Sequence, residues 1–99
     1  MIRLTGRLIA KTAEDSAIIR RYLPEHQRLS RAEDGCLFFE VIESDDPLIW
    51  WVEELYTDQR TFDAHQTRTR NSEWWKQTSA ILREYRIHEG SDVPAESPR

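Results

Sequence analysis

The chain contains almost no cysteine, because Cys36 is the only one among its 99 residues. A single cysteine excludes both an intramolecular disulfide and a metal site built from several thiolates. Long apolar runs are missing too, so we expect no membrane-spanning helix, no membrane partner, no secretion signal and a cytoplasmic location. What remains is a globular composition, 38% hydrophobic and 32% charged.

An excess of positive charge is also missing, since the net charge is −4. The basic residues between positions 20 and 31 alternate with Glu25 and Glu33, and those between 60 and 70 lie beside Asp58 and Asp63. Mixed runs of this kind usually form solvated helix faces. Nucleic acids require clustered positive charge, so we expect no nucleic acid among the partners.

The three histidines do not have the spacing of a metal centre. His26, His65 and His88 are far apart in the sequence, and no HxH or HExxH pattern occurs. We therefore expect no metal ion. His26 lies on the apolar stripe of a predicted helix, where a histidine is more often a hydrogen-bonded core or interface residue than a catalyst.

What the sequence does contain is a regular succession of apolar patterns. Alternation with a period of two predicts strands over residues 2–10, 36–43, 48–56 and 83–89. Helical spacing predicts one helix that begins after Thr12, and a second helical region that is broken near Asn71, the expected cap of its second part. Residues 1–89 thus form one domain, and the polar, proline-containing segment 90–99 is predicted to be a disordered tail.

The order strand, helix, strand, strand, helix, strand predicts an α+β fold. It is the ferredoxin-like βαββαβ plan, in which both helical regions cover one face of an antiparallel sheet. Residues 48–52, LIWWV, are apolar on both faces of the third strand, so the second face of the sheet also needs a cover. A second copy of the same sheet is the most economical cover. We therefore expect a homodimer, arranged as a dimeric α+β barrel.

The first strand divides its residues between two faces. Ile2, Leu4 and Leu8 form an apolar face, whereas Thr5 and Arg7 lie on the other. Two interpretations of the polar face remain open. It is exposed to solvent, as one face of an antiparallel sheet often is, or it lines a cavity in which Arg7 meets an anionic substrate.

A pocket is predicted around residues 50–65, WWVEELYTDQRTFDAH. Glu54 shares one face of the third strand with Val52 and Tyr56, and a carboxylate in such a strand is costly to bury unless it is paired or hydrogen-bonded. His65 lies on the following helix, over the same end of that strand. The pair of Glu54 and His65 is either catalytic or a polar contact that fastens the helix to the strand.

Three segments of the sequence resemble the antibiotic biosynthesis monooxygenase family of small dimeric α+β barrel proteins. They are RAEDGCLFFEVIESDDP, EELYTDQRTFDAH and SEWW, and the resemblance extends over residues 2–89. The family pattern has a glycine that opens the second strand, an acidic and an aromatic residue that end the third, and an alanine–histidine pair on the next helix. The matching residues are Gly35, Glu54 with Tyr56, and Ala64–His65. Many members carry tryptophan where this chain has Tyr56.

The resemblance implies a monooxygenase that needs no cofactor. Its substrates are expected to be a small aromatic or quinol-type compound and dioxygen, because a deprotonated hydroquinone or phenol can pass an electron directly to dioxygen. His65 is the expected base, and Glu54 is expected to orient it or raise its basicity. Arg7 is expected to stabilise the phenolate. The expected substrate-binding residues are Arg7, Thr5, Phe39, Trp51, Tyr56 and Trp74.

Two alternative functions remain open within the same fold. One is a non-catalytic dimeric module that binds a small metabolite, because a fold does not determine a function. The other is a haem-degrading monooxygenase, whose members carry an asparagine on the first strand and a tryptophan shortly before the histidine. This sequence has Thr5 and Gly6 at the first place, and Leu55 and Tyr56 at the second.

Overall fold

The computed structural model describes residues 1–90. Its elements follow one another as β1 (Ile2–Ile9), α1 (Ala13–Arg31), β2 (Cys36–Glu43), β3 (Ile49–Tyr56), α2 (Gln59–Arg70), α3 (Glu73–Thr78) and β4 (Leu82–Glu89). The predicted α+β plan is confirmed, with α2 and α3 as the two parts of the broken helix. Apart from Gly90, the tail predicted for residues 90–99 lies outside the described residues. Within residues 1–90, no helix is both long and apolar enough to cross a membrane.

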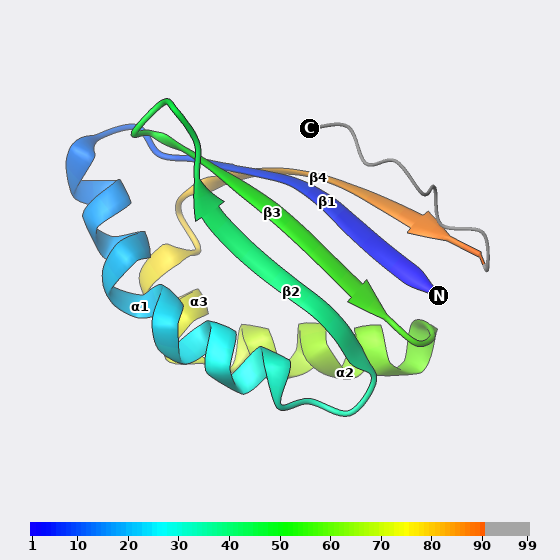
Figure 1. Cartoon of the computed structure of the whole chain (residues 1–99). Helices are drawn as coiled ribbons and strands as arrows, with labels where there is room; N and C mark the ends of the chain where they lie inside the picture. The colour runs from blue at the N-terminus through cyan, green and yellow to red at the C-terminus, as the bar shows by residue number, and fades with distance from the viewer. Residues whose placement is uncertain (91–99) are drawn as a thin grey trace.

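The four strands form one antiparallel sheet in the order β2–β3–β1–β4. Figure 1 shows the three helices gathered on one side of this sheet, while no described element covers the other side. Ile2, Leu4 and Leu8 of β1 face the helices, and each has at most 2% of its surface exposed. The apolar face predicted for the first strand is therefore the core face.

The central strand β3 divides its residues in the same way. Val52, Glu54 and Tyr56 are at most 5% exposed and lie on the helix side, whereas 49% of Trp51 is exposed on the opposite side. The register of the sheet pairs Glu54 with Leu4, so this carboxyl group lies in the middle of the covered face. The two faces predicted for the third strand are confirmed, and the carboxylate is on the buried one.

The loop between α1 and β2 packs closely on the beginning of α2. Gly35 has a φ of 82°, and a Cβ at this position would lie 2.4 Å from Thr61 Cγ2. A residue with a side chain cannot occupy this place without strain. Thr61 is itself fixed by a capping box with Asp58, whose carboxylate accepts a 2.9 Å hydrogen bond from the Thr61 amide. This close approach brings Glu33, two residues before Gly35, against α2.

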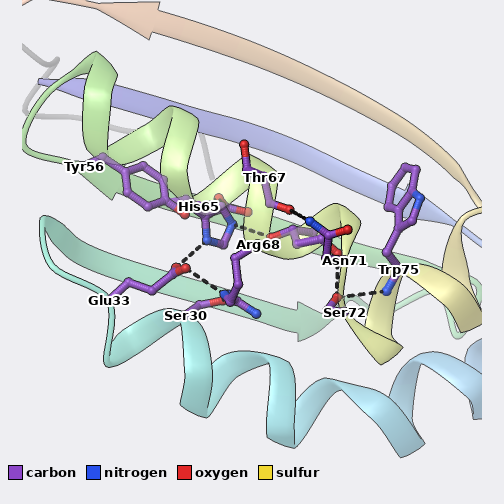
Figure 2. A network of polar contacts seen from close by, with 11 residues as sticks. Ser30, Glu33, Tyr56, His65, Thr67, Arg68, Asn71, Ser72 and Trp75 are labelled. Atoms are coloured by element: carbon purple, nitrogen blue, oxygen red, sulfur yellow. Dashed lines mark hydrogen bonds and ion pairs between the residues drawn. The ribbon is translucent and has the colours of Figure 1, made fainter.

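The N-cap of α3 is Ser72, so the prediction of Asn71 as its cap is wrong. An N-cap residue needs an extended backbone, which Ser72 has and Asn71 lacks. Ser72 Oγ accepts a hydrogen bond of 3.2 Å from the Trp75 amide (Figure 2). Asn71 ends α2 instead, where its side-chain amide donates to the Thr67 carbonyl at 2.9 Å.

A second close approach occurs in the middle of β1. A Cβ on Gly6 would lie 2.0 Å from the Glu84 carbonyl oxygen and 2.8 Å from Tyr85 Cδ1 on β4. The absence of a side chain therefore allows β4 and the ring of Tyr85 to lie directly against β1.

Candidate functional site

His65 lies beside two carboxylates on the helix side of the sheet. It comes from α2, and only 2% of its surface is exposed. Its Nδ1 is 2.6 Å from Glu33 Oε1, and its Nε2 is 3.5 Å from Glu54 Oε1. Figure 2 shows the imidazole next to the ring of Tyr56, with Nδ1 turned toward Glu33. The structure thus brings the predicted pair of Glu54 and His65 together, and it adds Glu33.

An arginine holds Glu33 as an anion. Arg68 Nε donates to Glu33 Oε2 at 2.7 Å, and Arg68 Nη2 donates to Ser30 Oγ at 2.8 Å. Burial by itself would raise the pKa of Glu33, but the hydrogen bonds from Arg68 and His65 outweigh it and lower that pKa below its usual range. An ionised carboxylate only accepts hydrogen bonds, so His65 carries its proton on Nδ1 and keeps a lone pair on Nε2.

Burial keeps the imidazole of His65 neutral. Removal from water lowers the pKa of His65, although the hydrogen bond with Glu33 acts in the opposite direction. A neutral imidazole that carries a lone pair on Nε2 can accept a proton near pH 7. With the proton on Nδ1, the hydroxyl of Thr69 on α2 donates a hydrogen bond of 3.3 Å to Nε2, which a substrate hydroxyl would replace.

Glu54 is a carboxyl group that is easily protonated. Only 5% of it is exposed, and burial raises its pKa to about 7, against the opposing effect of the hydrogen bond from Tyr56. Tyr56 Oη donates to Glu54 Oε1 at 2.7 Å, and burial next to this carboxyl group raises the pKa of Tyr56. Near neutral pH, Glu54 can therefore either accept a proton or donate one to His65 Nε2.

Aromatic rings surround this polar cluster. The ring centroids of Tyr56 and Phe39 lie 5.1 Å and 5.8 Å from that of His65. Trp74 stacks on the imidazole of His26, whose centroid is 5.9 Å from that of His65. Three of the predicted substrate-binding residues, Phe39, Tyr56 and Trp74, are thus gathered around the predicted base.

A cavity of about 240 Å³ opens beside this cluster. It lies between the helices and the β4 edge of the sheet. Its polar lining includes His26, Glu54, His65, Arg70 and Arg83, and its aromatic lining consists of Trp74, Trp75 and Tyr85. The guanidinium of Arg83 lies 5.0 Å from the ring centroid of Trp75, which fixes one wall of the cavity. The volume and lining suit a small aromatic molecule with a polar substituent.

The remaining predicted residues lie on the opposite face of the sheet. Thr5, Arg7 and Trp51 border a broad hollow of about 830 Å³ on the side that no described helix covers. Arg7 forms an ion pair with Glu84, with 2.8 Å between their charged atoms. Because successive strand residues point to opposite faces, Arg7 cannot reach the same cavity as Glu54. The structure does not bring Thr5, Arg7 and Trp51 together with His65.

Glu33 and Arg68 are site residues that the sequence did not reveal. We expected both to belong to solvated runs of mixed charge, whereas the structure buries their contact against His65. Glu33 lies in a loop and so belongs to no periodic pattern. Only its position two residues before the matched Gly35 could have drawn attention to it.

The family model of antibiotic biosynthesis monooxygenases matches residues 1–82 of the chain. A search of curated proteins finds no match. A solved structure of a Nitrosomonas europaea protein superposes with a TM-score of 0.75 at 20% identity, covering 91% of this chain and 98% of that one. A protein from Mycobacterium tuberculosis gives a TM-score of 0.75 at 21% identity, with 95% and 98% covered.

A third similar structure is that of SnoaB, a cofactor-independent oxygenase from Streptomyces nogalater. Its TM-score is 0.76 at 11% identity, and the superposition covers 96% of this chain and 97% of SnoaB. At these identities the structures establish the fold alone, whereas the family match extends over most of the sequence. The chain therefore belongs to the antibiotic biosynthesis monooxygenase family.

Proposed function

We propose that this protein is a cofactor-independent monooxygenase that oxidises a small aromatic or quinol-type compound with dioxygen. The observation that carries the proposal is the state of His65, a buried neutral imidazole beside an aromatic-lined cavity. Its Nδ1 is bonded to an ionised carboxylate, Glu33, and its Nε2 carries the lone pair. Deprotonation of a phenol needs a base of this kind in a place that excludes water.

In the proposed reaction, His65 Nε2 takes the proton of a substrate hydroxyl, and Glu33 stabilises the imidazolium that forms. The substrate anion gives one electron to dioxygen, and the two radicals combine at a substrate carbon to form a peroxide anion. The imidazolium returns its proton to this peroxide. The carbon that carries the peroxide also carries a hydrogen, so its C–H bond and the O–O bond break, water leaves, and a carbonyl group remains. One oxygen atom enters the substrate and the other leaves as water. The substrate itself supplies the two electrons that reduce this second oxygen atom, so no added reductant is required.

The proposed enzyme acts as a homodimer. The sheet face opposite the helices carries large apolar side chains, with exposed fractions of 45% for Phe38, 51% for Ile42 and 49% for Trp51. Apolar patches of this kind on a soluble chain usually mark an interface. A second copy placed face to face covers both patches at once by symmetry.

Oxygen consumption with a panel of hydroquinones and phenols tests the proposed activity. His65→Ala removes the proposed base, and we expect the rate to fall about 100-fold or more. His88→Ala is the matched control, because it removes an exposed histidine of β4 that pairs with Arg3 on the sheet face away from the helices.

The control is expected to keep the wild-type rate. If wild type and His65→Ala consume oxygen at the same slow rate with every compound of the panel, the monooxygenase proposal is refuted.

A non-catalytic binding module is the second candidate function. The contacts of Arg68 with Glu33 and Ser30 favour it, because they join α2 to α1 and give His65 a structural role. A thermal-shift screen separates the two functions. Compounds that stabilise the folded protein but are never oxidised would identify a binding module.

A further inference from the structure

α1 presents a second histidine to the cavity beside His65. Only 4% of His26 is exposed, and its ring lines the cavity together with Trp74. The two rings stack with centroids 4.8 Å apart and 3° between their planes. The ring of Phe39 lies nearly perpendicular to the imidazole, at an angle of 81° and a centroid separation of 5.3 Å. Packing against aromatic rings therefore fixes the orientation of His26.

No residue in the described part of the chain forms a hydrogen bond with this imidazole. Nδ1 of His26 is fully enclosed and has no partner within residues 1–90. Burying an N–H donor without a partner destabilises a protein, so the proton of this imidazole is not expected on the enclosed Nδ1. Burial, assisted by the nearby charge of Arg68, lowers the pKa of His26 to about 3, so the ring remains neutral.

A neutral imidazole has one nitrogen that donates and one that accepts. An enclosed nitrogen under the influence of the Arg68 cation is better occupied by a lone pair than by a proton. The proton therefore belongs on Nε2 of His26, which is the nitrogen that is not enclosed. This N–H has no acceptor among residues 1–90, and the ring borders the cavity.

We infer that His26 is a substrate-binding residue whose Nε2–H donates a hydrogen bond to the substrate oxygen that His65 deprotonates. This inference rests on the proposed function and names the ligand as a phenol or hydroquinone that binds as its anion. The ring centroids of His26 and His65 are 5.9 Å apart, so the two imidazoles can approach one oxygen from two sides. His65 takes the proton, and the N–H of His26 stabilises the negative charge that remains.

His26 takes the role that the sequence suggested for Arg7. Arg7 was the expected partner of the phenolate, but it lies on the opposite face of the sheet and is paired with Glu84. A neutral donor stabilises an anion less strongly than a guanidinium does, yet it leaves the neighbouring His65 free to accept a proton. A cation in the place of His26 would lower the basicity of His65.

Binding of 4-nitrophenol to the full-length protein tests the inference, because its anion is coloured and the compound need not be oxidised. The variant His26→Phe keeps an aromatic ring on Trp74 and removes the N–H. We expect the 4-nitrophenolate anion to bind about tenfold more weakly to this variant than to wild type. The isosteric probe 4-nitrotoluene lacks the oxygen, so its affinity is expected to change less than about twofold.

A second pair of variants makes the test independent of the folding of His26→Phe. His26→Gln keeps an N–H donor and is expected to bind 4-nitrophenolate more tightly than His26→Leu, which has none. The inference is overturned if wild type binds no 4-nitrophenolate. It is also overturned if His26→Phe binds 4-nitrophenolate as tightly as wild type does. The same holds if the affinities for 4-nitrophenolate and 4-nitrotoluene fall by the same factor, because His26 would then act through packing alone.

Oxygen uptake with hydroquinone on the same samples tests the proposed function separately. Selective loss of 4-nitrophenolate binding in His26→Phe, with no oxygen uptake by wild type, would refute the monooxygenase and retain the binding role of His26. Oxygen uptake by wild type and by His26→Phe with the same KM and kcat would support the monooxygenase and refute the binding role of His26.

Discussion

At the scale of single residues, the site combines acids and bases whose surroundings move their proton affinities apart. Glu33 is held ionised by Arg68, whereas burial raises the pKa of Glu54 to about 7. His65 and His26 are both neutral, but His65 has its proton turned toward Glu33, whereas Nδ1 of His26 has no partner among the described residues. Separation of proton affinities among neighbouring groups is characteristic of sites that move protons.

The buried carboxyl group of Glu54 makes the stability of the protein depend on pH. Its pKa is about 7 in the folded protein, compared with 4.5 ordinarily. Between these values the folded protein binds more protons than the unfolded chain, so this group makes stability fall as the pH rises. Glutamine does not titrate. We therefore expect the free energy of unfolding of Glu54→Gln, measured relative to that of wild type, to rise by roughly 2–3 kcal/mol between pH 5 and pH 8.

Urea denaturation of both proteins at pH 5 and pH 8 measures this gain. Glu43→Gln is the control, because its carboxylate forms an exposed ion pair with Arg20 and contributes little to stability. A difference between Glu54→Gln and wild type that is independent of pH, or that has the opposite sign, would contradict the raised pKa of Glu54.

At the scale of secondary-structure elements, the ends of the helices position the site. α2 delivers His65 and Arg68 from the same side, one turn apart, and the loop at Gly35 brings Glu33 to meet them. α3 then delivers Trp74 to the far wall of the cavity. The break between α2 and α3 is therefore part of the site, because an unbroken helix would carry Trp74 along the axis of α2.

The break depends on the cap at the beginning of α3. Ser72→Ala removes the hydroxyl that accepts from the Trp75 amide, and we expect a loss of about 1 kcal/mol in the free energy of unfolding. Asn71→Ala is the matched control and is expected to cost less, because the Asn71 side chain bonds only to the exposed end of α2. A larger loss for Asn71→Ala in thermal or urea unfolding would show that Asn71 is the more important cap.

At the scale of the whole molecule, the sheet has two unequal faces. One is covered by helices and contains the small cavity with His65, whereas the other contains the broad hollow with Trp51 and Arg7. The outer face is held in order by ion pairs between neighbouring strands, Arg3 with Glu53 and Arg7 with Glu84. Paired charges among exposed aromatic and aliphatic side chains are consistent with a surface that another protein chain covers.

Trp51→Glu tests whether this face is the interface of a homodimer. A charge in the centre of the apolar patch is expected to weaken dimerisation about tenfold or more, as measured by sedimentation equilibrium. Ile87→Glu is the matched control, because Ile87 is similarly exposed but pairs with Leu4 on the helix side. A wild-type protein that sediments as a monomer, or a Trp51→Glu variant that stays dimeric, would exclude this interface.

Much of the fold could be predicted because it follows from periodicity. Alternation assigned Leu4 to the covered face of the first strand and placed Glu54 and Trp51 on opposite faces of the third, as the structure has them. It did not predict which face of the third strand the helices cover. The site was predicted only in part. The resemblance grouped Arg7 with His65, and only the register between β1 and β3, which the sequence does not give, places Arg7 on the face opposite Glu54. Glu33 could not be predicted, since its position depends on the three-dimensional path of the loop around Gly35.

The absence of a side chain on Gly6 allows the two faces of the sheet to be coupled. Tyr85, which lies against this glycine, borders both the cavity with His65 and the outer hollow. A partner subunit seated in that hollow would therefore touch a ring that also forms a wall around the ligand. Association and ligand binding are then thermodynamically linked, so each strengthens or weakens the other by the same factor. In a homodimer, the apparent affinity for a ligand would vary with the concentration of the protein itself.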